Sequence, residues 1–357
     1  MASKSNVLID LVRLSFQNSS TENVKVDEWE PLMDQASIQG VLGFAFDGIQ
    51  KLSKSELPDK DKLLEWLGQY LYMEKQYNQY EETLAKLCHV FDRNGMDTLI
   101  LKGYGLSKLY PINSHRPCGD IDIYLIPRSG AWNAYKVGND LIESKGVVVD
   151  YTNHKHSTFI FNGQIVENHV NFFHVQVSCT EAKAEKVMQE LLDEGGLVEY
   201  KTSNFTCFFP SPQMNYFYLM RHMASHFRTR TSVTLRHLLD WGVFLNSYGE
   251  KIDLDRGQKL FREFGLVRLN DIFTTLAADI TGYDLSSYII APVNQYEKKR
   301  IMEDILNQGQ DFVPSGKLAM LWYKTVAFFK LFWKYKYFND NWEKAYFGLL
   351  SNIKGEG

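Results

Sequence analysis

Residues 118–126 read Cys-Gly-Asp-Ile-Asp-Ile-Tyr-Leu-Ile, and this stretch decides the expected fold. Side chains alternate along a strand, so Asp120, Asp122 and Tyr124 share one face while isoleucine and leucine side chains fill the other. The two carboxylates then stand about 7 Å apart along the strand and point the same way. Such a pair favours a cation between the two charges; the alternative is an amphipathic strand with two solvated aspartates.

A second pair of strands is predicted around an Asn162-Gly163 turn. The apolar runs 159–161 and 164–166 flank this dipeptide, which is the strongest short-range signal for a β-hairpin. A two-residue turn fixes the register, so position 161 faces 164, 158 faces 167 and 156 faces 169. A third carboxylate therefore lies on a polar strand face, whose members are His154, His156, Thr158, Glu167, His169 and Asn171.

Helical patterns surround these strands. Apolar residues recur three and four positions apart from residue 63 to residue 91, and this helix should end at Asn94-Gly95. We predict further helices near 129–145, 181–194, 214–228, 233–248, 257–266 and 316–350, and a second small hairpin at 198–209. The expected fold is α+β: an N-terminal helical region (1–95), a small mixed β-sheet core (96–180) and a mainly helical C-terminal domain (181–357).

Composition is that of an ordinary soluble globular protein. The chain has 357 residues, of which 45% are hydrophobic and 23% charged, and its formal net charge is −4. A negative balance argues against stable binding of duplex nucleic acid. The four cysteines form no CxxC pair, and neither a secretory signal nor a long uncharged apolar run is visible. We therefore expect a cytoplasmic protein without a transmembrane segment.

Five short motifs occur in a characteristic order. They are Leu-Lys-Gly (101–103), Leu-Tyr-Pro (109–111), Arg116, Gly-Asp-Ile-Asp-Ile (119–123) and Val-Glu-Asn-His (166–169). This order resembles the DNA-polymerase-β-type nucleotidyltransferase superfamily. More narrowly, it is similar to a bacterial family of nucleotidyltransferases, most of whose members lack a known substrate. The resemblance covers roughly residues 75–245.

The resemblance implies an enzyme in which Asp120, Asp122 and Glu167 are catalytic and hold two Mg²⁺ ions, with Mn²⁺ as an alternative. It implies transfer of a nucleoside monophosphate from a nucleoside triphosphate, with ATP the expected nucleotide, to a hydroxyl or phosphate of a small molecule or protein. Pyrophosphate leaves, so negative charge must be neutralised on both the entering and the leaving oxygens. Two hard cations with oxygen ligands supply that charge.

The same resemblance places the triphosphate at the turn after residue 101. The expected nucleotide-binding residues are Lys102, Gly103, Tyr104, Arg116, Gly119, His156 and His169. Gly103 would let the backbone approach the phosphates, and Lys102 and Arg116 would supply positive charge. The family usually has a second small residue where this chain has Tyr104, which motivates an alternative function: a non-catalytic nucleotide-binding sensor or scaffold on the same fold.

Histidines and a basic aromatic tail leave alternatives open. His156 and His169 are interpreted either as acid, base or phosphate contacts or as a structural pair, and a zinc site there is disfavoured beside aspartates. His222 and His226, one helical turn apart, suit either a metal or helix packing, and packing is the favoured interpretation. The tail at 317–350 is interpreted as a packed helix with extended lysines, and peripheral membrane contact is the disfavoured alternative.

Overall fold

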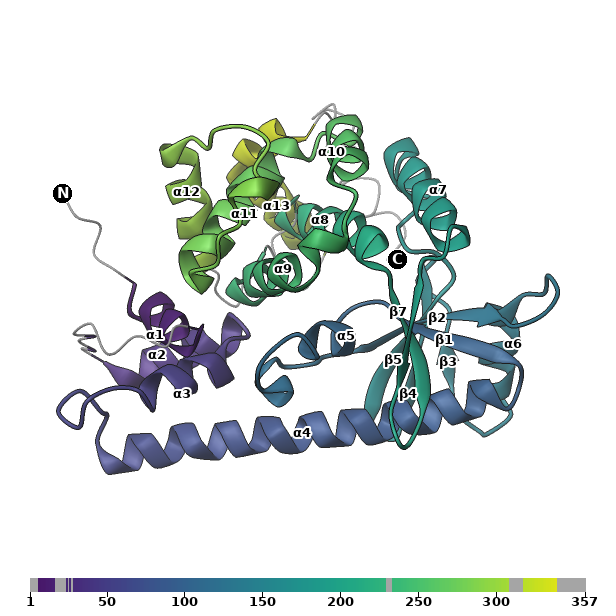
Figure 1. Cartoon of the computed structure of the whole chain (residues 1–357), viewed down its shortest axis with the longest axis horizontal. Coiled ribbons are helices and arrows are strands. Elements are labelled where there is room, and N and C mark those ends of the chain that lie inside the picture. Colours follow the sequence, from purple (N-terminus) through teal and green to yellow (C-terminus); the bar gives the residue numbers. More distant parts are fainter. Residues whose placement is uncertain are drawn as a thin grey trace. The chain divides into compact units, whose positions relative to one another are not determined.

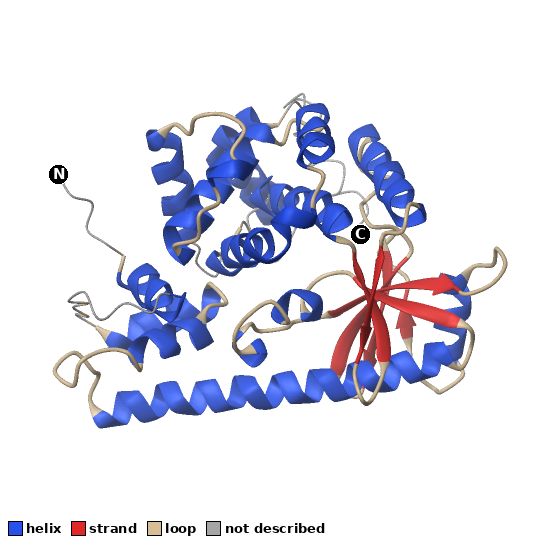
Figure 2. Ribbon diagram, in the orientation of Figure 1, coloured by secondary structure: helices blue, strands red, loops and turns tan. Residues whose placement is uncertain are grey.

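The computed structural model describes residues 6–16, 24, 26, 28–228, 233–307 and 317–338. The chain divides into two compact units, and Figure 2 shows its helices in blue and its strands in red. The first comprises Met1–Tyr216 and Val243–Ile252, and the second comprises Phe217–Gly242 and Asp253–Gly357. The first unit combines helices with all the strands of the described chain, whereas the second is helical. The expected α+β class is confirmed.

Within the described residues, seven strands form one mixed sheet in the order β3-β4-β5-β2-β1-β7-β6 (Figure 1). The strands are β1 (Met96–Ile100), β2 (Ile121–Pro127), β3 (Val149–Asp150), β4 (His156–Phe161), β5 (Gln164–His169), β6 (Leu197–Lys201) and β7 (Thr206–Pro210). The Asp-rich stretch forms β2 in the middle of this sheet, paired antiparallel with β1 and parallel with β5.

The hairpin β4–β5 has the predicted register. His156 pairs with His169, Thr158 with Glu167, and position 161 with position 164. Asn162 and Gly163 have φ values of 51° and 79°, as a tight two-residue turn with left-handed central residues requires. The turn also docks on a helix, because the Asn162 side-chain amide donates to Thr83 Oγ1 at 2.9 Å. A local turn signal therefore fixes the strand that carries the third carboxylate.

Two helices cover the apolar face of the sheet. They are α4 (Lys60–Asp92) and α6 (Ala134–Glu143). Their buried residues form one core with the inward side chains of β1, β2, β4 and β5. Its fully buried members, at 0% exposure, are Leu84, Leu87, Phe91, Tyr104, Ile121, Ile123, Ile142, Val166 and Cys207. As predicted, α4 ends before a left-handed glycine, Gly95, with φ 74°.

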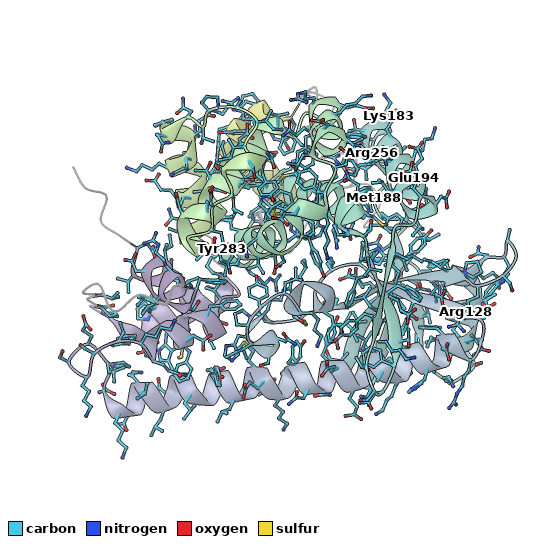
Figure 3. The ribbon with its side chains drawn as sticks, in the orientation of Figure 1. Arg128, Lys183, Met188, Glu194, Arg256 and Tyr283 are labelled. Atoms are coloured by element: carbon cyan, nitrogen blue, oxygen red, sulfur yellow. The ribbon has the colours of Figure 1, made fainter. Side chains whose placement is uncertain are left out.

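The opposite face of β2 packs against α7 (Cys179–Asp193). Figure 3 labels Lys183 and Met188 on α7 and Glu194 directly after it, and Met188 is fully buried. Gln189 Nε2 donates to the hydroxyl of Tyr124 at 3.2 Å, which places α7 on the face that also carries Asp122. One face of the sheet is thus apolar and closed by α4 and α6, while the other combines polar side chains with α7.

The N-terminal helices anchor the loop that leads into β2. They are α1 (Val7–Phe16), α2 (Trp29–Ile38) and α3 (Leu42–Ile49), and α5 (Tyr104–Ser107) and η1 (Asn113–His115) follow β1. His115 is 1% exposed; its Nδ1 lies 2.7 Å from Asp47 Oδ2, and its Nε2 lies 2.6 Å from Tyr70 Oη. The N-terminal helices, which the sequence analysis treated as a separate region, therefore hold the loop that leads to Asp120 and Asp122.

The sheet continues past residue 180, where the sequence analysis ended the core. The predicted hairpin at 198–209 exists as β6 and β7, and β7 pairs parallel with β1, Leu99 facing Phe208. Phe209 also packs on Tyr104, with ring centroids 6.2 Å apart. The sequence analysis placed this hairpin in the C-terminal domain, since the pattern after residue 180 is mainly helical. Its pairing with β1 joins residues about a hundred positions apart, which no local pattern encodes.

The helical unit contains the rest of the described chain. Its helices are α8 (Pro212–Arg228), α9 (Leu235–Tyr248), α10 (Leu254–Glu263), α11 (Val267–Thr281), α12 (Gln295–Leu306) and α13 (Lys317–Leu331), with α8 and α9 each continuing into the first unit. Lys334 is 1% exposed and its Nζ lies 2.6 Å from Asp304 Oδ2. Among the described residues no helix combines the length and apolar character needed to cross a bilayer. Residues 339–350 of the predicted tail helix lie outside the described chain.

Candidate functional site

Two of the three predicted carboxylates are direct neighbours across parallel strands. Asp122 of β2 is the register partner of Glu167 of β5. Neighbouring positions on paired strands project to the same side of a sheet, so both side chains lie on the polar face. Asp122 is 4% exposed, and the Glu167 side chain is 18% exposed. Asp120 lies one residue before β2 and is exposed, and its main-chain oxygen accepts a hydrogen bond from Tyr80 Oη at 3.3 Å.

A histidine joins the two buried carboxylates. His169 Nε2 lies 3.0 Å from Asp122 Oδ1 and 3.4 Å from Glu167 Oε2. Its Nδ1 lies 3.3 Å from the main-chain oxygen of Asn171, which can only accept a hydrogen bond. His156 Nδ1 lies 2.6 Å from Glu167 Oε2. The structure therefore brings both predicted histidines to the carboxylates.

Lys102 also reaches this cluster. Its Nζ lies 3.1 Å from Asp122 Oδ1, and the side chain is 23% exposed. The sequence analysis placed Lys102 beside the phosphates of a nucleotide, and in this structure it forms an ion pair with a carboxylate of the cluster. Because the ammonium group is partly exposed, it remains accessible to a ligand at the same face.

Electrostatics separate the three carboxylates into two kinds. Burial raises the pKa of Asp122, but Lys102 and His169 outweigh burial and bring it below its ordinary value. For Glu167 burial is likewise outweighed, by His156 and His169, and its pKa lies well below normal. Asp120 differs: burial and the charges of Glu167 and Asp122 raise its pKa, against a smaller effect of Lys102. Asp120 is thus the carboxylate whose charge repels its neighbours.

Two further residues near the carboxylates escaped the sequence analysis. Lys155, half-buried just before β4, has a pKa lowered by burial and by Lys102, while Asp122, Glu167 and Glu181 act in the opposite direction. The pKa of His174 falls to about 4 through burial and through the positive charges of its neighbours, Lys155 first. Neither residue belongs to a motif or a strand pattern, so only the fold reveals its position.

A buried amide network holds β5 in place. Asn168, between the two functional residues of the strand, donates from Nδ2 to Asn139 Oδ1 at 2.9 Å and to the main-chain oxygen of Tyr135 at 3.2 Å. Ser157 Oγ of β4 donates to the same Asn139 oxygen at 2.9 Å. Asn139 belongs to α6, so one helix fixes two strands. This network explains why an amide sits between Glu167 and His169 within the Val-Glu-Asn-His motif.

The predicted phosphate turn contains a left-handed glycine. Gly103 has φ 61°, a conformation that favours glycine, and a Cβ added there would lie 3.7 Å from Arg116 Nη1 and from Tyr80 Oη. Arg116 is 5% exposed and donates from Nη1 to the main-chain oxygen of Pro117 at 2.9 Å. The guanidinium group thus lies on the side of the turn toward which a Cβ of residue 103 would project. A Cβ on Gly119 would meet no atom within 4 Å, so close packing does not explain that glycine.

Tyr104 has its side chain in the core, not at the turn. It is 0% exposed, its ring stacks on Tyr77 and Tyr80, and its hydroxyl donates to Glu81 of α4. Lys108 Nζ lies 4.1 Å from the ring centroid and 2.8 Å from Glu81 Oε1. Only the backbone of Tyr104 remains a candidate contact for a nucleotide. The large residue at this position therefore does not project into the turn.

The donor set of the cluster fits a divalent cation. Asp122 and Glu167 are neighbours across paired strands, and burial together with the charges of both raises the pKa of Asp120, a repulsion that a bound cation would relieve. Carboxylate oxygens are the ligands that Mg²⁺ prefers. His156, Glu167 and His169 also offer one ligand atom each within 4.8 Å of one another, a mixed set that suits transition metals.

A pocket adjoins the cluster through His169. Its volume is about 310 Å³, and it lies beside the end of β2, between the start of α6 and α7. Aromatic rings are prominent among its lining residues, which include Tyr124, Trp132, Tyr135, His169, Val170 and Gln189. The Tyr124 ring stacks on Phe172 with centroids 4.6 Å apart. Such a lining suits a flat or partly apolar group.

Comparison with known proteins gives one finding at the level of the family. Residues 25–282 match the family described as uncharacterised nucleotidyltransferase. The match includes the sheet, the carboxylate cluster and the first helices of the second unit. No curated protein and no solved structure matches the chain.

Proposed function

Because the chain belongs to a family of uncharacterised nucleotidyltransferases, we propose that it transfers a nucleoside monophosphate from a nucleoside triphosphate to a hydroxyl or phosphate of a small-molecule or protein acceptor. Pyrophosphate is the leaving group. ATP is the proposed nucleotide. The general reaction is that of the family, and the metal, the nucleotide and the acceptor are our proposal.

The observation that carries the proposal is the register of two neighbouring strands. Asp122 and Glu167 face each other across β2 and β5, and Asp120 lies close enough for both charges to raise its pKa. We therefore assign all three acidic side chains to one site beside the Gly103 turn. Two Mg²⁺ ions held by Asp120, Asp122 and Glu167 would neutralise the oxygens that enter and leave the α-phosphorus.

The chain's own cations have distinct roles in this proposal. Lys102 Nζ lies 3.1 Å from Asp122 Oδ1, and the charges of Asp122 and Glu167 act on the half-buried Lys155. A triphosphate would add negative charge that both ammonium groups can bind. The turn at Gly103, which has Arg116 beside it, brings the backbone near Lys102. His169 keeps Asp122 and Glu167 oriented through its contacts of 3.0 and 3.4 Å.

The pocket beside His169 is our candidate for the acceptor or the nucleobase. It shares His169 with the carboxylate cluster, so a group bound there lies next to the proposed reaction centre. Its aromatic rings favour a planar or apolar group over a strongly charged one. Trp132, which lines it, has its indole nitrogen donating to the main-chain oxygen of Ser129 at 2.9 Å, so the ring is held in place.

The burial of the Tyr104 ring weakens the case for the alternative function, a non-catalytic sensor or scaffold. It rested on Tyr104 in the phosphate turn, and the ring of Tyr104 packs among Tyr77, Tyr80 and Phe209 instead. We further propose a cytoplasmic location, since all four cysteines are free thiols.

The test is incorporation of label from an α-labelled triphosphate. The wild-type protein is incubated with each of the four nucleotides, Mg²⁺ or Mn²⁺, and pools of small-molecule and protein acceptors. We expect labelled product with release of pyrophosphate, and a loss of at least about 10³-fold in Asp122→Asn, because several kcal/mol of charge stabilisation disappear. Glu199→Gln, which changes an exposed carboxylate on β6, is the matched control and should keep full activity. Triphosphate binding by calorimetry without turnover under any condition would favour the sensor.

A further inference from the structure

Three histidines cluster in the helical unit, apart from the residues of the proposed reaction. His222 and His226 are one turn apart on α8, and His237 lies in the first turn of α9. One ring nitrogen of each lies within 4.8 Å of the others, and all three side chains are half-buried. The ring centroids are 4.5 Å apart for His222 and His226 and 5.0 Å for His226 and His237.

The spacing of the first pair is that of two ligands of one ion. His222 Nε2 and His226 Nε2 lie 3.1 Å apart. Two imidazole nitrogens bound to one tetrahedral Zn²⁺, each at about 2.0–2.1 Å, stand about 3.3–3.4 Å apart. Residues at i and i+4 project from the same face of a helix, so α8 presents both rings together. A hydrogen bond between the two Nε2 atoms accounts for the same distance; a metal site also uses a ring nitrogen of His237, which lies within 4.8 Å of the other two ligand atoms.

We propose that His222, His226 and His237 bind one divalent transition-metal ion, with Zn²⁺ as the preferred ion. Imidazole nitrogens select Zn²⁺ and its neighbours, whereas the carboxylates of the first unit suit Mg²⁺. Three protein ligands leave a fourth position for water or for a small anionic group. This site does not depend on the proposed function, because it shares no residue with the carboxylate cluster.

The surroundings of His237 give the proposal a specific requirement. The backbone N–H of Thr234 donates to His237 Nδ1 at 3.1 Å, and the Thr234 hydroxyl lies 2.8 Å from the same atom. In this tautomer the proton is on Nε2. Binding through Nε2 moves that proton to Nδ1, which then donates to Thr234 Oγ1, and the contact with the Thr234 N–H is lost. Binding through Nδ1 displaces both contacts. In either case the environment of the Thr234 amide changes.

The experiment uses the full chain, stripped with a chelator and titrated with Co²⁺ as a visible substitute for Zn²⁺. With excess Mg²⁺ present to occupy the carboxylates of the first unit, we expect one Co²⁺ per chain, with ligand-field absorption that is lost when Zn²⁺ displaces Co²⁺. His226→Ala should weaken Co²⁺ binding by at least about 100-fold, since a direct ligand is lost. His89→Ala, an exposed histidine on α4, is the matched control and should leave binding unchanged.

Two further measurements separate this site from the mixed cluster in the first unit. Glu167→Gln removes the one carboxylate of the cluster formed by His156, Glu167 and His169, and the Co²⁺ spectrum should be unchanged in this variant. In the wild-type protein, amide NMR should show the Thr234 resonance shifting on addition of Zn²⁺, which tests the site even if a histidine variant unfolds. The proposal is overturned if Co²⁺ and Zn²⁺ at micromolar concentration do not bind. It is equally overturned if binding survives in folded His226→Ala and is lost in Glu167→Gln.

Discussion

Two neighbouring aspartates should respond to the same substitution with opposite changes in stability. Asp122 is 4% exposed and contacts Lys102 Nζ at 3.1 Å and His169 Nε2 at 3.0 Å, so its charge is balanced. Asp120 is more exposed than Asp122, and partial burial of its carboxylate together with the charges of Glu167 and Asp122 raises its pKa. In protein without divalent ions, Asp122→Asn should therefore destabilise the fold and Asp120→Asn should not. Both should abolish nucleotidyl transfer.

The size of each effect follows from the geometry. Two like charges about 7 Å apart repel by roughly 0.6 kcal/mol in bulk water and by roughly twice that at half the dielectric constant. Allowing for the positive charge of Lys102, Asp120→Asn should gain about 0.5–1 kcal/mol. Removing one partner of a buried ion pair costs about 3–5 kcal/mol, and partial hydration of Lys102 lowers this to about 2–3 kcal/mol for Asp122→Asn.

Thermal unfolding of the two variants measures the difference. At about 2–4 °C per kcal/mol, Asp120→Asn should raise Tm by about 1–4 °C and Asp122→Asn should lower it by about 4–12 °C, both in the presence of a chelator. Mg²⁺ should then stabilise the wild type more than Asp120→Asn, since a ligand that binds only the folded state raises its stability. Equal destabilisation by both substitutions would refute the account of charge at this site.

Three other predictions follow from contacts of the first unit. Asn168→Ala removes the amide network that positions β5 and should lower the free energy of unfolding by about 1–3 kcal/mol, measured by chemical denaturation. The same substitution should raise the Mg²⁺ concentration needed for half-maximal transfer. The pKa of Glu167 is lowered in the folded state. Its contribution to stability is therefore complete at pH values above its ordinary pKa and is lost as the pH falls through the pKa of the folded state. Acid unfolding of Glu167→Gln should accordingly be less steep than that of the wild type. Tyr104→Phe should cost about 1 kcal/mol by removing the bond to Glu81 and should leave the KM for triphosphate unchanged; a clear rise in KM would place the tyrosine at the nucleotide.

Local patterns predicted the strands that carry the carboxylates. Alternation placed Asp122 on the polar side of a strand, and the Asn162-Gly163 turn gave the pairing of His156 with His169, both of which the structure contains. A two-residue turn leaves little freedom of register, so such a prediction needs no knowledge of the rest of the fold. The family match likewise agrees with the motifs from which the resemblance was drawn.

Features that depend on distant parts of the chain could not be predicted in this way. The parallel pairing of β2 with β5 and of β1 with β7 joins segments far apart in sequence, and neither has a local signal. Lys155 reaches the carboxylates from a loop, so no periodicity indicates its direction. Tyr104 was assigned to the nucleotide by its place in a motif, whereas its burial follows from packing against α4 and β7.

The anchoring of His115 has a consequence for how small a working enzyme can be made. A fragment that begins at β1 keeps every motif of the family but removes Asp47 and Tyr70, the two partners of that imidazole. The ring would then lose both hydrogen-bond partners, and the segment between α5 and β2 would lose this anchor. Shortening this protein from its N-terminus should therefore impair catalysis well before it reaches the first residue of the sheet.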